Sequence, residues 1–207
     1  ERDSALTAGA IDGAISDPVG ALLFDRGRGE IKITSLCLGK TPGEGVFAIL
    51  AAPGSGIDSI EQLKNTEIAV SNATIIEYVT DRLLAEQGFE EHEIKKIEVK
   101  KMPIRMQMLI SGSVKAATLP EPLASIASGQ GAKVLLADSS VPESLSQTVI
   151  IFRRDTLKKK RRQVASLFEA YSQGVKASNE SPKDCQKLFV EKGRIPPFLS
   201  EKYPISV

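Results

Sequence analysis

Short apolar segments alternate with amphipathic segments along the chain, and turn residues separate them. Continuously apolar or β-branched segments predict strands at residues 31–38, 46–52, 67–70, 94–99, 133–137 and 148–152. Apolar positions recur with helical spacing in residues 75–87 and 103–110. From residue 155 onward the pattern is helical almost throughout, with breaks at Pro182 and Pro196. This alternation predicts an α/β protein with parallel crossovers.

One pattern occurs twice in the sequence. Residues 6–22 read LTAGAIDGAISDPVGAL, and residues 109–126 read LISGSVKAATLPEPLASI. In both, a helix end and a glycine precede a short apolar strand, an acidic residue, a proline and a new helix. The acids, Asp17 and Glu121, therefore follow the carboxyl end of a strand, where open α/β sheets bind ligands. The repeat predicts two similar lobes, although two unrelated corners with common turn chemistry would give the same match.

The two most apolar strands, residues 46–52 and 148–152, enclose the second copy of the repeat. If both are crossover strands, residues 49–148 form one lobe, while residues 1–48 and 149–207 together form the other. This topology predicts a cleft between the lobes, with the two strands as its hinge.

Composition and charge narrow the possible functions. The chain has 207 residues, of which 42% are hydrophobic and 26% charged, and its formal net charge is +1. These values are typical of a globular protein and favour neither nucleic acid nor a membrane surface as a partner. The longest apolar run has about eight residues, far too few to span a bilayer. A basic run at residues 158–162, KKKRR, has no interleaved aromatic residues, so a solvated helical face is favoured over an anionic partner.

Ser71, Asn72 and Thr74 follow a predicted strand and open a predicted helix. Free N–H groups and the helix dipole at such a place can hold an anion or a carbonyl oxygen. The same residue types are also the ordinary helix caps. Capping is the favoured interpretation, and a capped helix terminus at a cleft can still bind a ligand.

Asp17 and Glu121 form a possible pair of acids, one in each lobe. Such a pair could serve general acid–base catalysis or hold a metal. The one histidine, His92, lies in the polar segment EEHEIKK and is expected on a surface turn, so it supports neither role. Recognition of N–H or hydroxyl groups of a ligand is the more economical interpretation. We therefore expect no catalytic residue, no metal and no cofactor.

Four segments together carry a resemblance to a known family. They read IDGAISDPVGALL, FAILAAPGSGIDSIEQLKNTEIAVSNATIIEYVTDRLL, LISGSVKAATLPEPLASIASGQGAKVL and SQTVIIFRRD. In their order and spacing the chain resembles the substrate-binding proteins of bacterial ABC importers, in the group related to sulfonate, nitrate and thiamine-pyrimidine binders. The resemblance covers nearly all of residues 1–195. It implies a type II periplasmic-binding fold, in which two Rossmann-like lobes joined by two crossover strands close on a small molecule.

The resemblance also carries expectations about the site and the partner. It implies that Asp17, Ser71, Asn72, Thr74 and Glu121 contact a small polar or heteroaromatic ligand. That ligand would be delivered to a membrane permease by a monomeric protein, located in a periplasm or anchored by lipid at the cell surface. Family members normally begin with a strand–helix–strand unit that contributes ligand contacts, and we expect this part to be missing here.

Two alternatives to transport stay open. Fungal enzymes of thiamine-pyrimidine biosynthesis share the fold, but they use a cysteine-rich motif with histidines, whereas this chain has two isolated cysteines and His92. A ligand-sensing module without a transporter is the other alternative.

Overall fold

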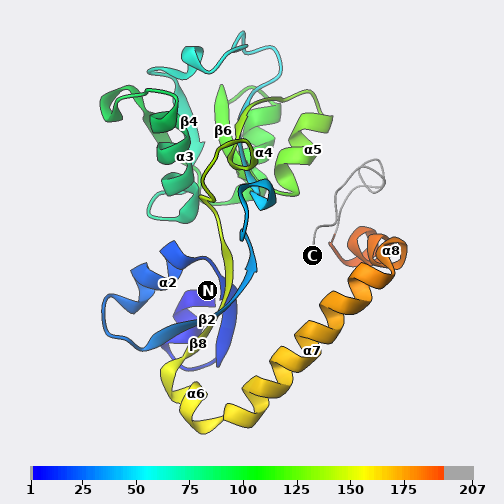
Figure 1. Cartoon of the computed structure of the whole chain (residues 1–207). Coiled ribbons are helices and arrows are strands. Elements are labelled where there is room, and N and C mark those ends of the chain that lie inside the picture. The colour runs from blue at the N-terminus through cyan, green and yellow to red at the C-terminus, as the bar shows by residue number, and fades with distance from the viewer. Residues whose placement is uncertain (1, 194–207) are drawn as a thin grey trace. The chain divides into compact units, whose positions relative to one another are not determined.

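The chain forms two compact units in the computed structural model, which describes residues 2–193 (Figure 1). Unit 1 consists of Glu1–Leu38 and Gln147–Val207, and unit 2 consists of Gly39–Ser146. The chain therefore passes from one unit to the other twice. The first passage comes earlier than the expected lobe boundary after residue 48, because the strand β3 (Phe47–Ala51) pairs only with strands of unit 2.

Unit 2 contains a five-stranded sheet in the order β5-β4-β6-β3-β7. The other strands are β4 (Glu67–Val70), β5 (Lys95–Glu98), β6 (Ala116–Pro120) and β7 (Lys133–Ala137). β4 runs parallel to β5 and to β6, so the predicted parallel crossovers are confirmed for these three strands. β3 runs antiparallel to β6 and β7. Three helices lie in the connections, α3 (Ile75–Glu86), α4 (Met102–Ile110) and α5 (Leu123–Gly129).

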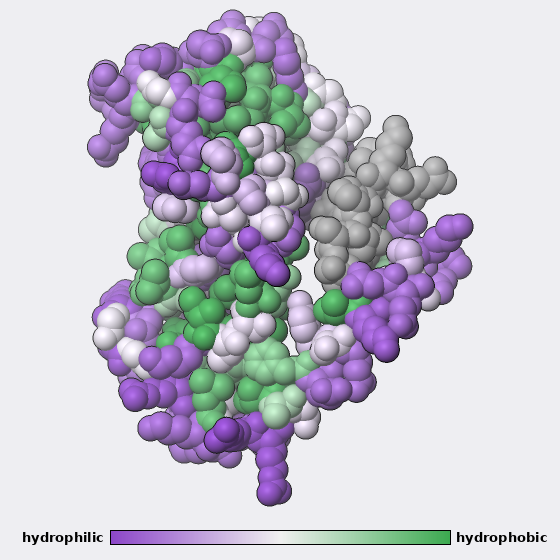
Figure 2. Space-filling view, viewed as in Figure 1, coloured by the Kyte–Doolittle hydropathy of each residue, from purple (hydrophilic) through white to green (hydrophobic). Residues whose placement is uncertain are grey.

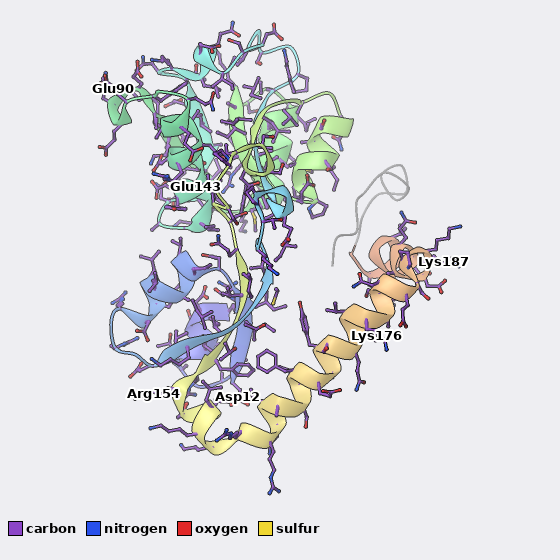
Figure 3. All side chains as sticks on the ribbon, in the orientation of Figure 1. Asp12, Glu90, Glu143, Arg154, Lys176 and Lys187 are labelled. Carbon is purple, nitrogen blue, oxygen red and sulfur yellow. The ribbon has the colours of Figure 1, made fainter. Side chains whose placement is uncertain are left out.

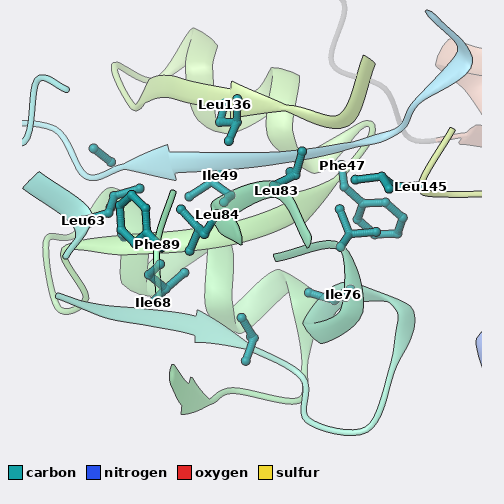
Figure 4. Packing of buried hydrophobic residues seen from close by; sticks show 14 of the residues in the cluster. Phe47, Ile49, Leu63, Ile68, Ile76, Leu83, Leu84, Phe89, Leu136 and Leu145 are labelled. Carbon is teal, nitrogen blue, oxygen red and sulfur yellow. The ribbon is translucent and has the colours of Figure 1, made fainter. Parts of the chain in front are cut away.

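The core of unit 2 forms around β3, whose five residues are all buried. This confirms the prediction of a strand covered on both faces. Ile49 of β3 belongs to the same cluster as Ile76, Val79 and Leu83 of α3, whose spacing places them on one face of that helix (Figure 4). Phe89 and Leu136 extend this cluster. Unit 2 therefore has an extensive hydrophobic core of its own.

Unit 1 contains a three-stranded antiparallel sheet in the order β1-β8-β2. Its strands are β1 (Gly13–Ser16), β2 (Ile31–Leu38) and β8 (Thr148–Arg153). Leu6, Ala21, Val149 and Ile151 form a smaller core on one face of the sheet. On the other face, Phe152 meets Phe168 edge to face, with 6.2 Å between the ring centroids.

The helices of unit 1 come from both ends of the chain. They are α1 (Arg2–Thr7), α2 (Pro18–Asp25), α6 (Arg154–Lys159), α7 (Arg161–Glu180) and α8 (Pro182–Gly193). α8 begins at Pro182, as predicted, because a first helical turn tolerates the missing N–H group. The predicted break at Pro196 lies outside the described residues.

Short 3₁₀ turns complete the connections, η1 (Pro42–Glu44), η2 (Glu61–Leu63), η3 (Glu91–Glu93) and η4 (Asp138–Ser140). Between β3 and β4 the chain forms only the single turn η2. There the side chain of Gln62 accepts hydrogen bonds from the N–H groups of Asp58 and Ser59, at 2.6 and 2.9 Å. These bonds satisfy the first N–H groups without a longer helix.

The side chain of Asp138 links the start of β3 to the last residue of unit 2. Its side chain is 1% exposed and accepts hydrogen bonds from the N–H of Phe47 at 3.0 Å and the hydroxyl of Ser146 at 2.5 Å. Burial raises the pKa of this carboxyl group, although the hydrogen bonds act in the opposite direction. Phe47 begins β3 and Ser146 is the last residue of unit 2, so one buried side chain fixes both segments.

We predict that Gly45→Ala destabilises unit 2 by about 2 kcal/mol, because a Cβ atom there would collide with the Asp138 carboxylate and lie 2.6 Å from the backbone nitrogen of Ser139. Gly43→Ala is the matched control, since a Cβ atom at Gly43 meets nothing within 4 Å. Urea unfolding followed by circular dichroism measures both variants. Equal stabilities would show that the approach of Gly45 to Asp138 is not tight.

Candidate functional site

The corner after β6 places Glu121 at the start of α5. The carboxylate of Glu121 accepts hydrogen bonds from the backbone N–H of Ser125 at 3.2 Å and from its hydroxyl at 3.0 Å. The backbone N–H of Glu121 donates to the carbonyl oxygen of Val46 at 2.7 Å. The acid is therefore anchored on both its side chain and its backbone.

The corner after β1 has the same construction in unit 1. Asp17 is the N-cap of α2, and its Oδ1 accepts a hydrogen bond from the N–H of Gly20 at 2.7 Å. The Oδ2 atom of Asp17 makes no hydrogen bond within residues 2–193. Both copies of the repeated sequence thus form a strand, an acid that binds the third N–H of the next helix, and that helix. Each acid has a structural role, and Asp17 keeps one oxygen for another partner.

The loop between β4 and α3 holds the other predicted residues. Thr74 is the N-cap of α3, since its hydroxyl accepts from the N–H of Ile76 at 3.2 Å and donates to the carbonyl of Ser71 at 2.7 Å. Capping by Thr74 is therefore observed. Ala73 has a φ of +54°, and its N–H donates to Glu77 at 2.6 Å. Asn72 is exposed at the tip of the loop.

Glu77 is held ionised beneath this loop. Burial raises its pKa, but the hydrogen bond from Ala73 and the ion pair with Lys96, at 2.9 Å, outweigh that effect, so the pKa is lowered overall. The loop backbone is thereby fixed by a charged acceptor.

Arg105 of α4 lies behind the loop with no exposed surface. Its guanidinium donates to the carbonyl of Val99 at 2.6 Å, to the carbonyl of Thr118 at 2.9 Å and to the hydroxyl of Ser71. No carboxylate pairs with it in the described part of the chain. Burial lowers the pKa of Arg105 to about 10, so the side chain is still cationic at neutral pH. A positive charge therefore lies buried directly behind Ser71.

Four of the five predicted residues share one edge of a sheet. β4 and β6 are neighbouring parallel strands, so Ser71, Asn72, Thr74 and Glu121 all follow the carboxyl ends of adjacent strands. Asp17 belongs to unit 1. We call the four residues in unit 2 the β4–β6 edge.

Two buried polar residues, Arg105 and Ser16, were not indicated by the sequence. Arg105 lies on a helix with apolar neighbours and gave no signal that it is buried. Ser16 is 5% exposed, and its hydroxyl has no hydrogen-bond partner within residues 2–193. A buried hydroxyl without a partner is rare, and it is a candidate ligand contact. Its position immediately before Asp17, at the end of β1, could have indicated it.

The remaining chemistry-bearing residues do not form a site in the described chain. His92 lies in η3 and is 75% exposed beside Glu90. Cys37 and Cys185 are both free. Among residues 2–193 no cluster of histidine, cysteine and acidic side chains could hold a metal ion. In the same residues no helix has the length and apolarity needed to cross a membrane.

Two α/β units joined by two passages of chain define the class, which is that of proteins with the type II periplasmic-binding fold. The chain belongs to the NMT1/THI5-like family, which matches residues 2–185. No curated protein matches the chain.

Solved structures support the fold. The alkanesulfonate-binding protein SsuA from Xanthomonas axonopodis pv. citri, bound to MOPS, is 16% identical with a TM-score of 0.82, covering 99% of this chain and 73% of that one. The periplasmic sulfonate-binding protein SsuA from Methylobacillus flagellatus KT is 15% identical with a TM-score of 0.74 over 97% of this chain. This chain spans 60% of the latter's length.

An enzyme has the same fold. The desulfurization enzyme DszB is 13% identical with a TM-score of 0.64, covering 86% of this chain and 66% of that one. At these identities the structural likeness shows the fold alone, so fold does not separate binding from catalysis here.

Proposed function

We propose that this chain is the solute-binding protein of a bacterial ABC importer, which captures a small polar or heteroaromatic molecule and delivers it to a membrane permease. The proposal rests on family membership and on a fold shared with sulfonate-binding proteins. The observation that carries it is the β4–β6 edge, where Asn72 is exposed and Ser71 is held by a buried cation.

The buried charge of Arg105 favours an anionic solute at this edge. In an environment of effective dielectric constant 20, a cation about 8 Å from an anion contributes about 2 kcal/mol. Taken alone, this attraction is roughly a thirtyfold preference over a neutral solute of the same shape, and the carboxylate of Glu121 at the same edge acts against it. Hydrogen bonds from Asn72 and the nearby N–H groups would then fix the orientation of the solute.

We also assign a place and a partner to this function. The chain acts outside the cytoplasm, in a periplasm or at the cell surface, as a monomer that meets a permease. The family and the fold support this assignment. A lipid anchor would hold the cell-surface form in place.

Binding without bond chemistry is favoured over catalysis by the state of the two acids. Both oxygens of Glu121 accept hydrogen bonds from Ser125, and one oxygen of Asp17 accepts from Gly20, so both carboxylates already serve the starts of helices. Incubation with a bound solute followed by mass spectrometry tests this assignment. Recovery of the solute unchanged supports a binding protein, whereas conversion to a product that is lost in Glu121→Gln would establish an enzyme.

We expect a thermal-shift screen of sulfonates, nitrate, pyrimidines and amino acids to find a stabilising anion, worth about 2.7 kcal/mol at a hundredfold excess over Kd. Asn72→Ala should then weaken binding of that anion tenfold or more, measured by calorimetry, because a charged solute loses a hydrogen bond.

Asn179→Ala is the matched control, since Asn179 is exposed on α7 in unit 1. It should leave the affinity unchanged. Stabilisation by none of the solutes, or the same affinity in Asn72→Ala as in the unchanged chain, would refute the assignment of the β4–β6 edge.

A further inference from the structure

A cavity of about 400 Å³ lies within unit 1, where β2 begins and β8 ends. Ile31 and Arg153 are among its lining residues. In the sheet, Ile31 pairs with Arg153, whereas Ser16 pairs with Val149 near the other end of β8. The cavity is therefore at the opposite end of this sheet from Ser16 and Asp17. Its volume is within the range of small-molecule sites in proteins.

The cavity has a fixed frame on the side of the α2–β2 turn. The carboxylate of Asp25 accepts hydrogen bonds from the N–H groups of Gly29 and Ile31, at 2.7 and 2.8 Å. These bonds lower the pKa of Asp25 and keep it an ionised acceptor. The N–H of Arg154 donates to the carbonyl of Glu30 at 2.7 Å, which joins the turn to the end of β8. This side of the cavity is thus held by the short side chain of Asp25 and by one backbone hydrogen bond, and it does not depend on long surface side chains.

The lining carries an excess of positive charge. Four of its side chains are cationic, namely Arg28, Arg153, Arg154 and Lys158. Two are acidic, namely Glu30 and Asp155. Arg153 pairs with Asp155 at 3.0 Å, and Arg28 lies 3.4 Å from Glu30. Arg154 and Lys158 make no ion pair and no side-chain hydrogen bond within residues 2–193. Two positive charges at the cavity are therefore uncompensated.

These two cations face the same space. Arg154 and Lys158 are four residues apart on α6, so they lie on one face of that helix. The guanidinium of Arg154 also approaches the turn, since a Cβ atom at Gly29 would be 4.0 Å from it. Figure 3 shows Arg154 at this end of unit 1, and Figure 2, in the same orientation, shows many hydrophilic residues at the lower left of the view.

The floor of the cavity is apolar. Leu6 is 1% exposed, and Ile31 packs beside the same small core. An occupant would therefore place an apolar group against this floor and an anionic group against Arg154 and Lys158. The excess of two positive charges matches a phosphate monoester, which carries between about −1.5 and −2 at neutral pH.

We propose that this cavity binds an organic phosphate monoester, whose phosphate is held by Arg154 and Lys158 and whose apolar group contacts Ile31. The basic run that continues along the chain strengthens the attraction. Lys160 of this run is paired with Asp12 at 2.7 Å, so the run is partly neutralised and Lys158 is the member that lines the cavity. The ester can come from a soluble compound or from the headgroup of a lipid.

The test uses the full chain, phenyl phosphate as a probe and two double variants of equal charge. Arg154→Gln with Lys158→Gln should weaken binding of phenyl phosphate at least tenfold in calorimetry. Lys176→Gln with Lys187→Gln is the control, because these lysines are 77% and 78% exposed on α7 and α8. The control should change affinity less than twofold. All four side chains are exposed, so both variants should fold, which circular dichroism checks.

Two further probes identify the source of the ester. Inorganic phosphate should bind at least tenfold more weakly than phenyl phosphate, because it lacks the apolar group. Vesicles of phosphatidylcholine with phosphatidic acid should sediment the chain, and pure phosphatidylcholine should not, if the headgroup is the occupant. A loss of phenyl phosphate binding or of vesicle binding that occurs only in the Arg154 and Lys158 double variant supports the site. Which of the two is lost shows whether the ester is a soluble compound or a lipid headgroup.

Three outcomes would overturn the proposal. Equal losses in both double variants would mean general attraction of anions to a basic surface. Equal affinities for inorganic and phenyl phosphate would mean an adventitious ion only. Binding in neither arm would mean that the cavity is not a site. The Arg154 and Lys158 double variant should leave unchanged the affinity for the anion found in the thermal-shift screen, because both residues lie in unit 1, outside the β4–β6 edge. This proposal and the function proposed above can therefore fail separately.

Discussion

Arg105→Met is expected to lower the free energy of unfolding of unit 2 by roughly 3 to 5 kcal/mol. The guanidinium supplies the hydrogen bonds of the Val99 and Thr118 carbonyls and of the Ser71 hydroxyl. A buried acceptor that loses its donor costs about 1 to 3 kcal/mol. Methionine keeps most of the aliphatic packing but offers no donor. The loss is reduced, though not cancelled, because a buried positive charge is removed at the same time.

A matched variant shows whether the lower free energy of unfolding is specific to Arg105 or follows from the removal of any arginine in unit 2. Arg82→Met removes a guanidinium that is 45% exposed and pairs with Glu86 at 3.6 Å and Glu143 at 3.3 Å. Exposed pairs contribute little, so this control should change stability by less than about 1 kcal/mol. Arg105→Lys should be intermediate, since an ammonium reaches fewer of the acceptors. Urea unfolding measures the series, and equal effects of Arg105→Met and Arg82→Met would contradict the structural role of Arg105.

The strands could be predicted closely from the sequence. Residues 31–38, 67–70 and 133–137 have the bounds that the apolar pattern indicated. The acid–proline corners were also visible, because a proline at a helix start and an acid before it have local causes. Asp17 is an N-cap for such a local reason. Pro122 differs, since it precedes the first residue of α5, whereas Pro18 is the first residue of α2.

Pairing could not be predicted in the same way. The continuous apolar run at residues 46–52 indicates burial on both faces, but it contains no information on direction or on neighbours. β3 proved to be antiparallel to β6 and β7 and to belong wholly to unit 2. The lobe boundary expected after residue 48 lies inside this strand, because an apolar run does not indicate where one lobe ends and the next begins.

Arg105 escaped prediction for a different reason. Helical spacing gave α4 correctly, but an arginine among apolar residues normally indicates a solvated face. Its burial depends on three acceptors from separate segments, namely the carbonyls of Val99 and Thr118 and the hydroxyl of Ser71. Those atoms converge only in the folded unit. The part of the candidate site that depends on long-range convergence is thus the part that the sequence did not reveal.

Ile49→Ala is expected to destabilise unit 2 by about 2 to 5 kcal/mol. Ile49 has no exposed surface and lies on β3, between Thr118 of β6 and Leu136 of β7. Removing three carbons leaves a cavity among strands that pair on both sides, so the neighbours cannot collapse into it without breaking sheet hydrogen bonds. Ile49→Val should cost only about 0.5 to 1.5 kcal/mol, because it removes one methylene group.

Val134→Ala is the matched control, since Val134 is 44% exposed on the neighbouring strand β7 and pairs with Leu50. It should cost less than about 1 kcal/mol, the span of strand propensities. Hydrogen exchange of peptides from β3 and β6 measures the opening of unit 2 directly, and its rates should rise in Ile49→Ala far more than in Val134→Ala. Similar rates in the two variants would mean that β3 is not the centre of the core, and the fixed geometry of the β4–β6 edge would then need another support.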